Sequence, residues 1–101
     1  MGLLLFDQYS YLHFAVGIIF YFWNISFNKS LFFHTIFEIG ENTNIGMKLI
    51  NSFSFWPGGK NYRDSNINII GDTIAFIIGF ISARFLDNYG YMNKWFEKHI
   101  K

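Results

Sequence analysis

The 101-residue sequence contains no cysteine, a single proline and few charged residues. Without cysteine the chain forms neither a disulfide framework nor a thiolate metal site. Charged residues make up 15 % of the chain, well below the roughly 25 % of soluble domains. A formal net charge of +1, with basic residues scattered except near the C-terminus, gives no basis for binding nucleic acid. These absences argue against a disulfide-stabilised scaffold, a thiolate metal centre and a nucleic-acid-binding domain.

What the sequence has instead is apolar and aromatic residues. Apolar residues make up 51 % and aromatic residues 23 %, including 14 phenylalanines. This composition predicts a single all-α membrane domain spanning residues 1–101. A soluble helical bundle is the alternative. The predicted membrane-embedded helices cover about 8–25, 31–50 and 64–86, and a short amphipathic helix at about 90–100 is expected to lie in the membrane interface.

The stretch 62–86 combines a polar start with a long apolar run. It places Asp64, Asn68 and Asp72 at four-residue steps, which puts their side chains on one face of a helix. Lipid offers such groups no hydrogen-bond partner, so they are expected to face protein, water or an ion. The rest of the chain should therefore supply polar partners.

The first two helices carry side chains suited to that role. His13 lies on the first helix, and Glu38, Glu41 and Asn42 follow the polar side of the second. Whether the second helix crosses the bilayer or re-enters on one side is open at this level. The sequence thus predicts one intramembrane polar cluster, made of His13, Glu38, Glu41, Asn42, Asp64, Asn68 and Asp72.

Three motifs occur in order within residues 10–86. GIIFY at 17–21 follows His13, EIGEN occupies 38–42, and DSNINIIGD occupies 64–72. In this pattern the chain resembles an uncharacterised family of small multi-pass membrane proteins known from alphaproteobacteria, itself distantly similar to VanZ-like proteins. The resemblance implies a multi-pass helical fold and no established activity. The family pattern has a second histidine just before the glycine, where this chain has Val16.

Three interpretations of the polar cluster compete. The first is a buried hydrogen-bond network that fixes the register of the helices. The second is a divalent metal site with His13, Glu38, Glu41 and Asp72 as ligands, whose bound water attacks a lipid or lipid-linked substrate. The third is an ion or proton path, which a chain of this size would build only as an oligomer.

The first interpretation predicts a structural or assembly component of a membrane or membrane-containing complex, viral and organellar assemblies included. Its expected partners are membrane lipids and other membrane subunits or further copies of the chain. A metal-dependent membrane enzyme is the alternative function. Lys29 and the basic C-terminal tail fall on the same side of a three-span protein, and this side is predicted to be cytoplasmic.

Overall fold

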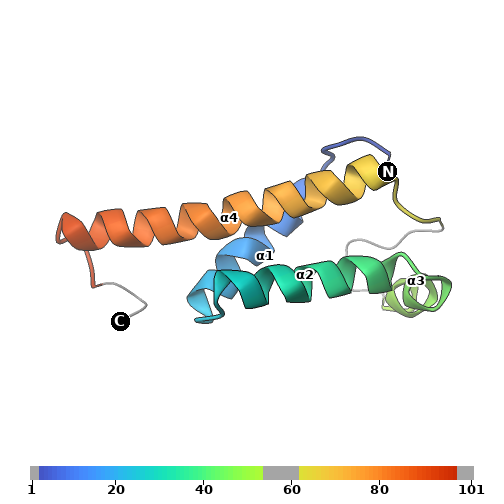
Figure 1. Ribbon diagram of the computed structural model, residues 1–101, viewed down its shortest axis with the longest axis horizontal. Coiled ribbons are helices and arrows are strands. Elements are labelled where there is room, and N and C mark those ends of the chain that lie inside the picture. The colour runs from blue at the N-terminus through green and yellow to red at the C-terminus, as the bar shows by residue number, and fades with distance from the viewer. Residues whose placement is uncertain (1–2, 54–61, 98–101) are drawn as a thin grey trace.

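The computed structural model describes residues 3–53 and 62–97, and this part of the chain is helical with no strand (Figure 1). The predicted all-α class is therefore confirmed. The helices are α1 (Ser10–Phe22), α2 (Phe27–Glu41), α3 (Asn44–Asn51) and α4 (Asn66–Met92).

Helix α4 is the longest element, and α1 packs against it more extensively than any other helix does. Figure 1 shows α1 crossing α4, with α2 running lengthwise beside them. Two glycines allow the backbones of α1 and α4 to touch. A Cβ atom on Gly17 would overlap the carbonyl oxygen of Phe76, and one on Gly79 would overlap that of Phe14. Small residues at a crossing are the usual means of close helix packing in membranes.

A short turn reverses the chain between α1 and α2. Asn24 has a φ of 63°, a left-handed conformation that asparagine tolerates better than most residues. The amide of Asn24 donates to the carbonyl of Tyr21, and that of Ile25 donates to Phe20, which is a Schellman motif. Ser26 then caps α2 by accepting from the Lys29 amide at 3.3 Å. Successive helices α1, α2 and α4 therefore run in alternating directions along the long axis of the molecule (Figure 1).

The predicted second helix over 31–50 is wrong as a continuous element. In the structure α2 starts earlier, at Phe27, and ends at Glu41, after which α3 begins at Asn44. Thr43 causes the break, because its hydroxyl accepts from the Gly46 amide at 3.0 Å and donates to the Gly40 carbonyl at 2.7 Å. One side chain thus closes the end of α2 and starts α3. Figure 1 shows α3 nearly end-on in a view where α2 lies lengthwise.

The predicted separate helix at 90–100 is also wrong within the described residues. Helix α4 continues to Met92, and residues 93–96 form turns and bends. Lys94 has a φ of 59°. Its amide donates to Tyr91, and the Trp95 amide donates to Gly90, so a Schellman motif ends the helix. Residues 98–100 of the predicted helix lie outside the described part of the chain.

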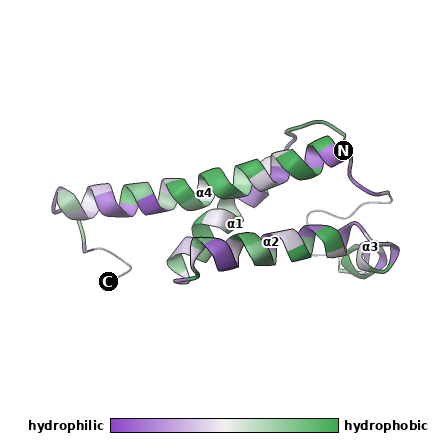
Figure 2. Cartoon of the chain, viewed as in Figure 1, coloured by the Kyte–Doolittle hydropathy of each residue, from purple (hydrophilic) through white to green (hydrophobic). Residues whose placement is uncertain are grey.

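The distribution of polarity is inverted relative to a water-soluble domain. Among the described residues, five apolar side chains are buried. Eight polar or charged side chains are buried: Ser30, His34, Glu38, Asn42, Asp64, Asn68, Asp72 and Asp87. The outer face of α4 instead exposes a row of isoleucines, at 67, 70, 74, 78 and 81, and much of the α4 ribbon has the colour of hydrophobic residues in Figure 2. Among the described helices, α4 alone combines the length and apolar composition needed to cross a membrane, while α1 is apolar but shorter.

Candidate functional site

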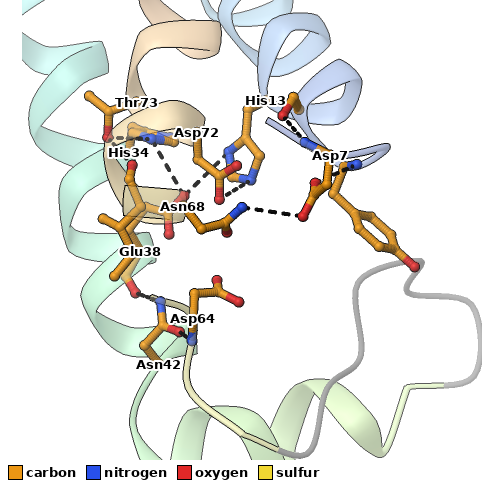
Figure 3. A network of polar contacts seen from close by, with 12 residues as sticks. Asp7, His13, His34, Glu38, Asn42, Asp64, Asn68, Asp72 and Thr73 are labelled. Carbon is orange, nitrogen blue, oxygen red and sulfur yellow. Dashed lines mark hydrogen bonds and ion pairs between the residues drawn. The ribbon is translucent and has the colours of Figure 1, made fainter. Parts of the chain in front are cut away.

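His13 lies at the centre of a polar cluster to which α1, α2 and α4 all contribute (Figure 3). Its Nδ1 atom is 3.4 Å from Oε1 of Glu38, and its Nε2 atom is 3.2 Å from Oδ2 of Asp72. One imidazole on α1 thus links a carboxylate of α2 to a carboxylate of α4. This is the juxtaposition that the sequence predicted for these three residues.

His34 belongs to the same cluster, although the predicted cluster did not include it. Its Nε2 atom is 3.7 Å from Oε1 of Glu38 and 3.4 Å from Oγ1 of Thr73. The ring stacks on Phe76 with 4.4 Å between centroids and lies edge-on to His13 at 5.2 Å. The signal for His34 was present in the sequence, because it precedes Glu38 by four residues and therefore shares its helix face.

Two carboxylates of the cluster are almost completely buried. Glu38 is 2 % exposed and Asp72 is 3 % exposed. Within residues 3–53 and 62–97, no group donates a hydrogen bond to either oxygen of Glu38 or to Oδ1 of Asp72. Burying a charged group without such partners costs free energy, so buried charges are normally paired or bound to a metal. The cluster therefore has unused acceptor capacity in its interior.

Two overlapping sets of side chains have the composition of a metal site. His13, Glu38, Glu41 and Asp72 each bring one ligand atom, and these four atoms lie within 4.8 Å of one another. His13, His34 and Glu38 meet the same condition. Imidazole and carboxylate together suit Zn, Mn and Fe. The four residues that the sequence predicted as metal ligands are thus close together.

Asn68 does not bond to His13 or Glu38 but ties the N-terminal segment to α4. Its side-chain amide donates to the carbonyl of Leu4 at 2.7 Å and to Oδ2 of Asp7 at 3.2 Å. The neighbouring N-cap, Ser65, accepts from the Asn68 amide at 3.1 Å. Asn68 therefore holds the start of α4 against the segment that leads into α1.

Asn42 and Asp64 form a second group at the end of α2. The Asn42 side chain donates to the Glu38 carbonyl at 2.8 Å and accepts from the Asp64 amide at 2.8 Å. Asp64 precedes the N-cap of α4, so it is not on a helix face shared with Asp72, which corrects the predicted four-residue stripe. Figure 3 shows this pair apart from His13. These two residues connect helix ends.

Comparison with protein-family models, with curated proteins and with solved structures found no match for this chain.

Proposed function

We propose that this chain is a multi-pass integral membrane protein that serves as a structural or assembly component, with α1, α2 and α4 embedded in the bilayer. The observation that carries the proposal is the inverted polarity. The buried set includes one histidine, His34, and four carboxylates, at 38, 64, 72 and 87. The isoleucine row of α4 and the phenylalanines at 32, 33 and 37 of α2 are exposed.

A bilayer accounts for both halves of that distribution. Exposed apolar faces of this kind on a protein in water mark an interaction surface or a membrane contact. In lipid the same faces need no other cover, and ionisable groups turn toward the interior of the bundle. Helix α4, with 27 residues, is about 40 Å long and exceeds the ~30 Å hydrocarbon core. The motif resemblance to multi-pass membrane proteins supports the same assignment.

The polar cluster supports a structural role because it joins three helices at one level. Hydrogen bonds between membrane helices contribute roughly 0.6 to 2 kcal/mol each. The ion-pair contacts of His13 with Glu38 and Asp72 are polar contacts between helices of this kind, and in our proposal they set the register of α1 against α2 and α4. The exposed apolar faces are left to lipid and to other membrane subunits or further copies of the chain, which we propose as its partners.

A metal-dependent membrane enzyme acting on lipid or lipid-linked substrates is the second candidate. The gathering of four ligand atoms from three helices favours it. A metal bound there would supply an activated water for attack on a phosphate or ester. The assay is release of phosphate or headgroup from lipid vesicles by purified protein, with Glu38→Gln as the inactive comparison.

The proposed topology is tested by labelling single cysteines, which the cysteine-free chain makes direct. Exposed Asn28, Ser52 and Asn93 would each be replaced by cysteine and treated in intact cells with a membrane-impermeant maleimide. Three crossings predict that the reagent labels Ser52→Cys but reaches Asn28→Cys and Asn93→Cys only after lysis, because those two lie on the cytoplasmic side.

Extraction of membranes with alkaline carbonate provides the control. The wild-type chain is expected to stay in the pellet and to be released by detergent. Release by carbonate alone would contradict the proposal that the chain is an integral membrane protein. Labelling of all three cysteines from the same side would contradict the three crossings.

A further inference from the structure

We infer that the His13–Glu38–Asp72 cluster, completed by Glu41, binds one divalent first-row transition-metal ion of the zinc or manganese type. This goes beyond a structural role, because a hydrogen-bond network needs no metal. It also holds whether or not the helices lie in a membrane, since it rests on the interior of the helix group alone.

The first support is the convergence of ligand atoms from separate helices. Four ligand atoms within 4.8 Å of one another are close to the spacing that one ion requires, since Zn²⁺ binds nitrogen and oxygen at about 2.0–2.2 Å. The four come from α1, α2 and α4 rather than from one acidic stretch.

The second support is independent of that distance. No group in the described part of the chain donates a hydrogen bond to the two oxygens of Glu38 or to Oδ1 of Asp72, and the two residues are only 2–3 % exposed. In the described structure the ion pairs of both carboxylates are formed with histidine. A protonated histidine carries one positive charge, whereas the two carboxylates together carry two negative charges. A divalent cation would balance both negative charges and would bind to the carboxylate oxygens that accept no hydrogen bond.

His13 lies between the two buried carboxylates of the proposed site. Its Nδ1 atom faces Glu38 and its Nε2 atom faces Asp72, so the imidazole is within reach of an ion held by either carboxylate. His34, 3.7 Å from Glu38 through Nε2, is placed to orient that carboxylate from the other side.

The ligand chemistry selects the class of ion. Imidazole suits Zn, Fe, Cu and Ni, whereas carboxylate also suits Mn, and sites for Mg²⁺ and Ca²⁺ use oxygen ligands. A set of one nitrogen and several carboxylate oxygens therefore favours Zn²⁺ or Mn²⁺ over Mg²⁺. The probes are accordingly Zn²⁺ and Mn²⁺, with Mg²⁺ as the ion expected not to compete.

The experiment uses the full chain purified in mild detergent and treated with a chelator. Equilibrium dialysis against Zn²⁺ or Mn²⁺ is expected to give about one ion per chain, unaffected by excess Mg²⁺. Glu38→Gln and Asp72→Asn keep the shape of each side chain and should weaken binding by at least about tenfold, the lower limit seen even for partners of ligands. Asp87→Asn is the matched control, since Asp87 is equally buried on α4 but bonds to Tyr21.

Several results would overturn the inference. Uptake of neither ion by the wild-type chain would do so, and so would equal loss of binding in Asp87→Asn, which would place the metal elsewhere. If a carboxamide variant does not fold, the wild-type chain loaded with Co²⁺ tests whether the imidazole binds the ion. Its visible absorption and a paramagnetically shifted imidazole N–H signal should appear and be removed by Zn²⁺, and their absence would refute imidazole ligation.

Discussion

Replacing Gly17 with alanine is the most direct test of the contact between α1 and α4. The added Cβ atom would overlap the carbonyl oxygen of Phe76 and would lie 2.8 Å from the amide nitrogen of Phe80. Both are backbone atoms of α4, so no side-chain rotation relieves the overlap. The two helices must move apart, and the contacts along their crossing loosen together.

The expected magnitude combines two opposing effects. Overpacking of a close contact costs about 1–3 kcal/mol, and a rigid backbone partner places this case toward the upper end. Alanine in place of glycine within a helix returns up to about 1 kcal/mol. We therefore expect Gly17→Ala to lower the free energy of unfolding by about 1–2 kcal/mol.

Gly40 provides a matched control. It also lies within a helix, but a Cβ atom built on it meets nothing within 4 Å. Gly40→Ala should therefore be neutral or stabilise the fold by up to about 1 kcal/mol. The two variants then differ by about 2 kcal/mol, or roughly 30-fold in the folding equilibrium constant.

Unfolding is measured by helical circular dichroism as the fraction of SDS in mixed micelles is raised. Gly79→Ala, which meets the Phe14 carbonyl across the same crossing, should behave like Gly17→Ala. If Gly17→Ala and Gly40→Ala unfold at the same SDS fraction, the close backbone contact of α1 with α4 does not exist, and the arrangement of the three helices must be revised.

Two further predictions concern polar contacts outside the His13 cluster. Tyr21→Phe removes the hydroxyl that donates to buried Asp87 at 2.5 Å. It should lower the free energy of unfolding by about 1.5–3 kcal/mol, as for hydrogen bonds to charged groups. Additive effects of Tyr21→Phe and Asp87→Asn in a double-mutant cycle would show that this contact contributes nothing to stability. Asn42→Ala should cost about 1–3 kcal/mol, because it removes a buried bridge between the Glu38 carbonyl and the Asp64 amide. Asn93 makes the same bond to the carbonyl four residues back but is exposed, so Asn93→Ala should be milder, and equal losses of stability in the two asparagine variants would refute this argument.

Hydrophobic runs predicted where helices occur better than where they end. The predicted first and third helices contain α1 and most of α4 because each is a long apolar segment. The predicted end of this helix, at about residue 86, is too early, because the sequence turns polar at Asp87. That residue is buried against Tyr21, a tertiary contact that no local pattern reveals. Lys94 in a left-handed conformation ends the helix instead, and lysine is not a usual signal for that.

The candidate site was predictable in its centre and less so at its edges. Four-residue spacing relates Asn68 to Asp72, and both are buried on α4. The spacing also predicts Asp64 on this face, but Ser65 caps the helix after it. The backbone amide of Asp64, rather than a shared helix face, connects it to Asn42. The contacts between buried polar side chains of different helices depend on how α1 crosses α4, and local sequence patterns do not determine that crossing.

The helices that meet at His13 differ greatly in length. α1 and α2, with 13 and 15 residues, are about 20 and 22 Å long, whereas α4 is about 40 Å. In the bilayer that we propose, α1 and α2 are shorter than the hydrocarbon core and α4 is longer, so the protein has hydrophobic mismatch of opposite sign on its two sides. The long helix is accommodated by tilting, and lipids beside the short pair must thin to match them. If several copies associate through their short helices, fewer lipids are in contact with those helices and less of the bilayer has to thin. Hydrophobic mismatch would therefore favour association of the copies.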